Sequence, residues 1–66
     1  MANQNETSYV DNIPITVVRS KRRRSFGIQI TQGKFVLRVP SRASRSSIEH
    51  SMNRFAPWVR QKHAIL

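Results

Sequence analysis

The sequence contains no cysteine, so neither a disulfide nor a thiolate zinc site can hold the chain together. It is also poor in acids, because only three Asp and Glu residues oppose twelve Lys and Arg residues and leave a net charge of +9. A chain of 66 residues supports one domain, and a core of this size rarely supplies more than about 3–5 kcal/mol. We therefore expect one domain of marginal stability whose positive field attracts polyanions.

Residues with catalytic or metal-binding chemistry are few and scattered. His50 and His63 are the two histidines, and the sequence has no His-Glu-x-x-His motif, no cysteine pair and no carboxylate cluster. No two of the acids are placed to share acid–base catalysis. We expect a chain that is not itself an enzyme, that holds no metal or other cofactor, and whose histidines lie on the solvent side of a helix.

Long apolar runs are absent as well. No stretch approaches the roughly 20 apolar residues that a membrane-spanning helix needs. The first six residues, Met1 to Glu6, lack the basic and apolar regions of a secretory signal. The sequence therefore predicts a cytoplasmic protein that does not associate with membranes.

The beginning of the chain differs in composition from the rest. Residues 1–11 are polar and aperiodic, which predicts a disordered tail, although Tyr9 and Val10 could extend an edge strand. Residues 12–66 are then expected to form the single folded domain.

Three segments with alternating apolar residues predict β-strands. The first covers 13–19, where Pro14 puts the strand at a sheet edge or delays its pairing until after the proline. The second covers 26–31, and its Gly27 suggests a bulge or a close approach by another backbone. The third covers 34–39, and Gly33 before it supplies the positive φ of a hairpin turn. The predicted inward side chains are Ile13, Ile15, Val17, Phe26, Ile28, Ile30, Phe35, Leu37 and Val39.

A helix is predicted after these strands. Ser46 and Glu49 form a capping-box pattern, which starts the helix at Ser46 and puts Glu49 in its first turn. Pro57 lacks the amide that would bond to Asn53, so we expect a kink or a break there, followed by a second short helix. The predicted fold is α+β, a three-stranded antiparallel sheet followed by a C-terminal helix kinked or broken near Pro57. The apolar stripe of the helix is Ile48, Met52, Phe55 and Val59, with Trp58 beside it as a further core residue.

The strongest charge run lies between two predicted strands rather than at a terminus. Residues 19–24 carry five basic side chains, and no acid occurs between Asp11 and Glu49. Folding would hold this run at one end of a hairpin, where it either binds phosphates or remains a solvated turn. The candidate anion- or nucleic-acid-binding residues are Arg19, Lys21, Arg22, Arg23, Arg24, Arg38, Arg42 and Arg45.

An ordered series of short elements extends from residue 13 to residue 63. It consists of a strand, Arg19-Ser20-Lys21-Arg22-Arg23-Arg24-Ser25, a strand with Ile28 and Ile30, Gly33, Val36-Leu37-Arg38-Val39-Pro40, Ala43, Ile48, Phe55 and Trp58-Val59-Arg60-Gln61-Lys62. Each element is common by itself, but their order and spacing resemble the N-terminal part of the YgjP-like metal-dependent hydrolases, often described as zinc metallopeptidase-like. The resemblance covers about three quarters of the chain.

The resemblance implies a particular division of labour. In that family the β-rich segment precedes a catalytic part, in which His-Glu-x-x-His and a further histidine bind zinc. No residue of this sequence matches a catalytic or metal position of that part. The resemblance therefore implies a non-catalytic N-terminal subdomain or a truncated form, whose basic edge faces an anionic or peptide substrate and whose partner is the missing zinc-binding catalytic domain.

A small basic nucleic-acid-binding module is the alternative function. A sheet backed by a helix can lay strands in a groove while basic turns hold the phosphates of a nucleic acid or nucleotide. A DNA reader would carry more Arg, Asn and Gln on its outer sheet face, whereas Val18 and Val36 suit a surface that another domain covers. The sequence thus favours the hydrolase subdomain. The predicted outer face consists of Thr16, Val18, Gln29, Thr31, Val36 and Arg38.

Overall fold

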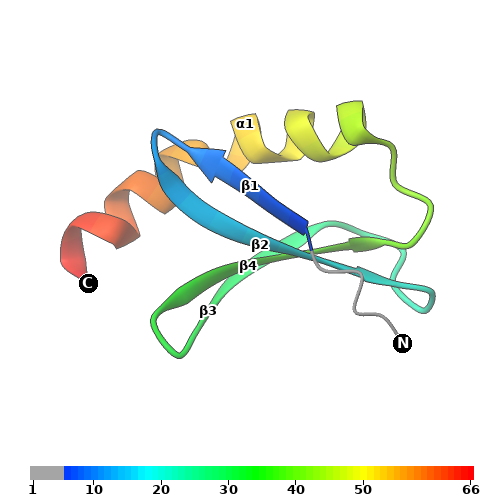
Figure 1. Ribbon diagram of the computed structural model, residues 1–66, viewed down its shortest axis with the longest axis horizontal. Helices are drawn as coiled ribbons and strands as arrows, with labels where there is room; N and C mark the ends of the chain where they lie inside the picture. Colours follow the sequence, from blue (N-terminus) through cyan, green and yellow to red (C-terminus); the bar gives the residue numbers. More distant parts are fainter. Residues whose placement is uncertain (1–5) are drawn as a thin grey trace.

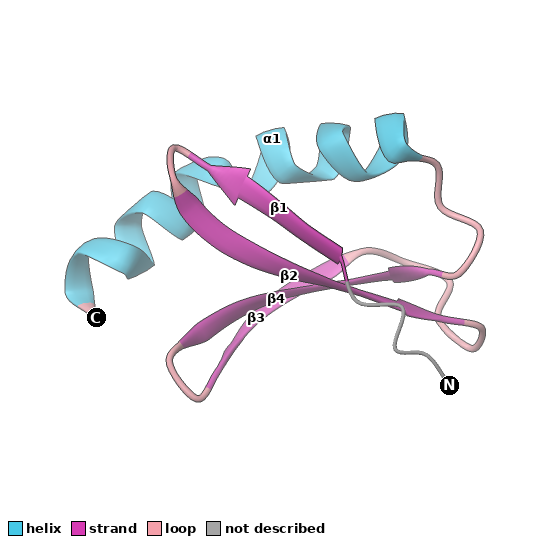
Figure 2. Cartoon of the chain, in the orientation of Figure 1, coloured by secondary structure: helices cyan, strands magenta, loops and turns pink. Residues whose placement is uncertain are grey.

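The computed structural model describes residues 6–66, which form a four-stranded sheet with one long helix over one face (Figure 1, Figure 2). The strands are β1 (Glu6–Val10), β2 (Ile13–Ser20), β3 (Gly27–Thr31) and β4 (Lys34–Pro40), and the helix is α1 (Arg45–Ile65). The predicted α+β class is confirmed.

The sheet has the strand order β1-β2-β4-β3 and is mixed rather than antiparallel. β1 pairs with β2, and β3 with β4, in antiparallel ladders, whereas β2 and β4 run parallel. The predicted three-stranded antiparallel sheet is therefore wrong in strand number and in direction. That prediction assumed that strands adjacent in sequence also lie side by side, which holds for only about two-thirds of strands.

β4 takes a central position because its inward row of side chains is the most completely buried. Phe35, Leu37 and Val39 are each at most 3% exposed. The connection from β2 to β3 crosses the end of β4 and therefore spans two strand spacings, about 10 Å. Its six residues reach about 20 Å when extended, so the connection is long enough. β2 is an internal strand and pairs with β1 at Ile13 and Pro14, so neither prediction for that proline holds for the whole strand; only the ladder with β4 begins after it, at Ile15.

β1 corrects the prediction for the start of the chain. A disordered tail was expected over residues 1–11, with Tyr9 and Val10 as a possible extension of an edge strand; β1 is such an edge strand, and it pairs with β2 along its whole length. Its turn consists of Asp11 (φ 58°) and Asn12 (φ 111°), short polar residues that tolerate positive φ. Residues 1–5, the rest of the predicted tail, lie outside the described residues.

The turn between β3 and β4 is the one that the sequence predicts. Gln32 and Gly33 both have positive φ, 53° and 75°, as the two-residue turns that match strand twist require. The role assigned to Gly33 is confirmed.

The core lies between α1 and one face of the sheet, and the predicted alternation of the strands is confirmed. Trp58 packs at the margin of this core, where its ring meets Phe35 edge-on with centroids 6.1 Å apart. Phe55 is half-buried beside it. The buried apolar residues are Val10, Ile15, Val17, Phe35, Leu37, Val39, Ile48, Met52, Ala56 and Val59.

α1 is one helix, so the predicted break and second helix at Pro57 are wrong. Figure 1 shows the axis of α1 changing direction in its second half, as expected for a proline that leaves the Asn53 carbonyl without its amide partner. The loss of one hydrogen bond does not end the helix, because Ala56 and Val59 on either side of the proline are buried against the sheet.

The helix also begins one residue earlier than predicted and with a different cap. Ser44 is the N-cap, and its hydroxyl accepts a hydrogen bond from the amide of Ser47 at 3.0 Å. The predicted capping box of Ser46 and Glu49 is wrong, and the first turn contains no acid. Ser44 and Ser46 are both suitable N-caps by residue type. The turn that precedes the helix, in which the amide of Ala43 bonds the carbonyl of Pro40, places Ser44 at the cap position.

Replacing Ile48 by Ala should lower the free energy of unfolding by about 2–5 kcal/mol, because Ile48 is 4% exposed and its truncation leaves a cavity. The matched control is His50→Ala on the exposed face of α1, which should change stability by less than about 0.5 kcal/mol. Urea denaturation followed by circular dichroism measures both variants. Equal midpoints for the two would contradict the assignment of the core.

Candidate functional site

Two loops converge at the end of the sheet where β2 and β4 finish. Because these strands are parallel, the β2–β3 connection and the β4–α1 connection leave from the same end of the sheet. The carbonyl of Ser20 joins them, since it accepts hydrogen bonds from the amides of Arg23 (3.3 Å) and Ser41 (3.0 Å). The prediction that the basic run lies at the end of a hairpin is therefore wrong. The run lies in the loop that crosses the end of β4, beside the connection that leads to α1.

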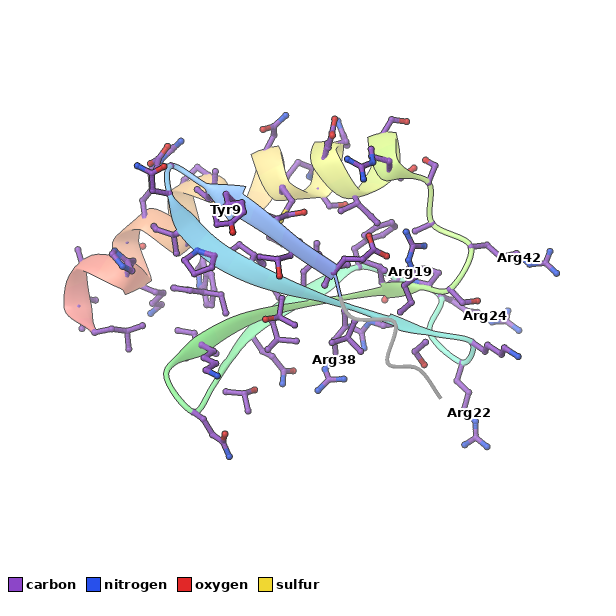
Figure 3. All side chains as sticks on the ribbon, in the orientation of Figure 1. Tyr9, Arg19, Arg22, Arg24, Arg38 and Arg42 are labelled. Carbon is purple, nitrogen blue, oxygen red and sulfur yellow. The ribbon has the colours of Figure 1, made fainter. Side chains whose placement is uncertain are left out.

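Four exposed cations project from these two loops, and we call them the basic end: Lys21, Arg22, Arg24 and Arg42. Figure 3 shows the three arginines extending from one end of the molecule. Lys21 and Arg42 line a shallow depression together with Arg23. The fold thus brings together predicted binding residues that lie far apart in the sequence.

Arg19 belongs to the same predicted set but points to the helix side of the sheet. Its Nε donates to Glu6 at 2.5 Å, and its Nη1 donates to the carbonyls of Ser41 (3.1 Å) and Ala43 (2.7 Å). These partners come from β1 and from the β4–α1 connection. Arg19 ties both to β2, so its contacts indicate a structural role rather than the predicted anion-binding one.

Glu6 is held in its charged form by this arrangement. The hydrogen bond from Arg19 lowers the pKa of Glu6 from its ordinary value of 4.5; partial burial opposes this shift, and the positive charges of Arg19 and Arg45 reinforce it. Arg45 lines a depression with Glu6 and Glu49 on the helix side. Of the predicted binding residues, Arg45 is therefore another that the fold does not place at the basic end.

The sheet face opposite α1 is uncovered among the described residues, and we call it the open face. The six residues predicted for the outer face do lie on it, and the side-chain amide of Gln29 donates to Thr31 at 3.0 Å. Figure 3 shows Arg38 on the side of the sheet away from α1. The open face consists of Thr7, Tyr9, Pro14, Thr16, Val18, Gly27, Gln29, Thr31, Lys34, Val36 and Arg38.

All three acids of the sequence lie on the helix side or in a turn tied to it. Glu6 bonds Arg19, Glu49 is exposed on α1, and Asp11 accepts from Arg60 of α1 at 2.6 and 3.3 Å. The Arg60 guanidinium lowers the pKa of Asp11. The open face and the loops at its end consequently hold no acid but seven of the twelve basic residues: Lys21, Arg22, Arg23, Arg24, Lys34, Arg38 and Arg42.

Neither histidine is placed as a metal ligand. His50 and His63 are both exposed on α1, as predicted, and the ring of His63 lies 6.5 Å from that of Phe35. Within residues 6–66, no three His, Cys, Asp or Glu side chains gather closely enough to hold a metal ion.

Two contacts in this region were not predicted from the sequence, that of Arg19 with Glu6 and that of Arg23 with Gly27. Glu6 was placed in the disordered tail, so its bond to Arg19 was not foreseen. The signal that could have found it is the pair Asp11-Asn12 between two β-prone segments, a hairpin pattern. Arg23 was grouped with the exposed run, although it folds back over Gly27. No local sequence signal indicates that contact.

Glu6→Gln should lower the free energy of unfolding at pH 7 by about 0.2–1 kcal/mol, since the Glu6 side chain is 42% exposed and water screens the pair. Arg19→Ala should cost more, about 1.5–3 kcal/mol, because two backbone carbonyls also lose a charged donor. Glu49→Gln is the control and should leave stability nearly unchanged.

The advantage of the native protein over Glu6→Gln should depend on pH. A pKa lowered by folding stabilises above the unfolded value of 4.5 and loses that contribution as the pH falls through the folded value. The free energies of unfolding of the native protein and of Glu6→Gln should therefore approach each other as the pH falls below about 4.5. A difference that persists unchanged at pH 2 would refute the ionic contribution of Glu6.

In comparisons with known proteins, no protein-family model, no curated protein and no solved structure matches the chain. Among the described residues, no helix has both the length and the apolar character needed to cross a membrane. The resemblance to the YgjP-like hydrolases accordingly rests on the residues quoted for it.

Proposed function

We propose that the chain is a non-catalytic sheet-and-helix subdomain of a YgjP-like metal-dependent hydrolase, which presents its basic end to an anionic substrate or partner. One observation carries the proposal: the residues that make up the resemblance meet one another in the fold. Such contacts are expected if the series belongs to one folded unit of that family.

The contacts within the series are specific. Arg19 donates to the carbonyl of Ala43, which is a separate element of the resemblance. Ile48 and Val59 are buried in the same core as Leu37 and Val39. The shared pattern therefore corresponds to requirements of one fold, and this supports a common architecture for the β-rich segment.

The catalytic chemistry would come from elsewhere in such a hydrolase. Since the described residues provide no zinc site, the metal and the general base would belong to the His-Glu-x-x-His part. This chain would contribute positive charge beside the substrate path, where the exposed side chains of Lys21, Arg22 and Arg24 attract and orient anionic groups.

A chimera tests this proposal. The β-rich segment of a YgjP-like hydrolase is replaced by this chain, and zinc-dependent hydrolysis is compared with that of the parent. We expect the chimera to retain activity well above that of two controls, a deletion of the segment and an unrelated α+β domain of equal size. A folded, zinc-loaded chimera no more active than the deletion would refute the proposal.

Nucleic-acid binding is the second candidate function, and the segregation of charge favours it. A surface with seven cations and no acid repels itself, and a polyanion relieves that repulsion. For either function we propose a cytoplasmic location.

Duplex binding should be weak, blind to sequence and steeply dependent on salt. The logarithm of the association constant should fall with the logarithm of salt concentration by roughly 0.9 for each phosphate contacted. Replacing Lys21, Arg22 and Arg24 by Ala should flatten this slope and weaken all sequences alike, as fluorescence anisotropy can measure. A strong preference for one duplex sequence at physiological salt would contradict a purely electrostatic basic end.

A further inference from the structure

Arg23 does not extend into solvent with its neighbours in the basic run. Its Nε donates to the carbonyl of Ser25 at 2.9 Å, and its Nη2 occupies the place that a Cβ on Gly27 would take. The sequence predicted a bulge or a close backbone at Gly27, and the structure puts the guanidinium of Arg23 there instead. Because Ile28 faces the core, the vacant side-chain position of Gly27 faces the open face.

Arg38 lies directly beside this position. In the antiparallel ladder Gly27 is the partner of Arg38, so the Arg23 guanidinium over Gly27 and the Arg38 side chain lie on the same face of one pair of strands. Both are half-buried, and the open face carries no acid to neutralise them. Two neighbouring arginines on one acid-free surface can hold an oxyanion, and the fork of donors that a guanidinium presents suits phosphate.

Apolar and hydrogen-bonding side chains surround this pair of arginines. Val18 is the partner of Arg38 in the parallel ladder, and Val36 is two residues away on the same strand. Both valines are half-buried on a face that no described residue covers. Tyr9 lies on the same face, is 66% exposed and pairs with Pro14, which is four residues or about 13 Å along β2 from Val18.

We propose that Arg23 and Arg38 form a phosphate clamp and that the open face binds single-stranded nucleic acid. A phosphate is held between the two guanidiniums, neighbouring bases lie over Val18 and Val36, and a further base stacks on Tyr9. The proposal goes beyond the hydrolase subdomain and rests on the nucleic-acid candidate, to which it adds the form of the ligand and the surface that holds it.

The neighbours of the clamp favour a single strand over the other polyanions. A duplex keeps its bases stacked inside and would offer only phosphates to this face, whereas a single strand exposes base faces that pack on apolar and aromatic side chains. An acidic peptide would satisfy the charges but would leave Val18, Val36 and Tyr9 without flat apolar partners.

Gly27→Ala offers a test that changes no charge. The added Cβ would displace the end of the Arg23 side chain, which is flexible, and Gly27 does not have the positive φ that would make alanine strained. Arg38→Gln removes the second guanidinium, and Lys34→Gln is its matched control, an equal loss of charge on the same face at the other end of β4. Circular dichroism melts establish that each variant is folded.

Anisotropy titrations with a labelled 12-nucleotide oligothymidine, a 12-base-pair duplex and a poly-glutamate peptide give the readout, all at the same low salt concentration. The native protein should bind the single strand at least about fivefold more tightly than the duplex. Arg38→Gln and Gly27→Ala should each weaken single-strand binding about tenfold, and Lys34→Gln less than twofold. Tyr9→Ser should weaken binding of the single strand but not of the duplex.

A double variant isolates the position of Arg23. If Gly27→Ala acts only by moving that side chain, then adding it to Arg23→Gln should cause no further loss. Equal effects of Lys34→Gln and Arg38→Gln, or native affinity in Gly27→Ala, would overturn the clamp. Tighter binding of the duplex or of poly-glutamate would overturn the single-strand assignment.

The outcomes also separate this inference from the candidate function on which it rests. Duplex binding that disappears when Lys21, Arg22 and Arg24 are replaced, in a protein that is insensitive to Gly27→Ala, would leave nucleic-acid binding at the basic end and remove the clamp. Absence of binding to every polyanion at low salt would overturn both.

Discussion

β2 and β4 run parallel and therefore finish at the same end of the sheet. The positions of the charged loops follow from that pairing. The connection that leaves β2 has to cross the end of β4, while the connection that leaves β4 leads to the face of the sheet that α1 covers. Arg19 holds this crossing together, because its guanidinium bonds Glu6 of β1 and two carbonyls of the β4–α1 connection. An antiparallel β2–β4 pair would have sent the two loops to opposite ends and divided the basic residues between them.

The placement of the acids bears on how so small a protein accommodates a net charge of +9. Its acids are used where they hold elements together, Glu6 between β1 and β2 and Asp11 between the first turn and α1. The remaining cations are left to repel one another on the open face and at the basic end, which destabilises the folded state. A bound polyanion would remove that repulsion and stabilise the fold by mass action, so binding and folding of this chain would then be coupled.

The sequence was sufficient for features set by local pattern. Alternation identified the buried faces of β2, β3 and β4, Gly33 identified a turn, and the stripe from Ile48 to Val59 identified the buried side of α1. It was insufficient wherever a non-local choice decided the outcome. The insertion of β4 between β2 and β3 depends on which strand buries its side chains best, and the continuity of α1 through Pro57 depends on packing at Ala56 and Val59.

The candidate site shows the same division. Composition and position predicted Lys21, Arg22, Arg24 and Arg42 as surface cations, and they are exposed. A charge count cannot distinguish such residues from Arg19, whose carbonyl partners are brought near by the fold, or from Arg23, which bonds the adjacent Ser25 carbonyl and lies over Gly27. The sequence indicated only Tyr9 and Val10 of β1, because the first three residues of that strand are polar, and the carboxylate of Glu6 that bonds Arg19 was missed for the same reason.

The two candidate functions place different demands on the open face. A catalytic domain docked over Val18 and Val36 would cover Arg23 and Arg38 as well, and two desolvated guanidiniums would then need carboxylates from that domain, because none is available on this face. A hydrolase that leaves the open face exposed has no such requirement and can use it for substrate. The basic end is compatible with both arrangements, since its side chains project beyond the sheet (Figure 3). Arg23 and Arg38, rather than the more numerous exposed arginines, are therefore the residues whose surroundings in a larger assembly would distinguish a docking surface from a binding surface.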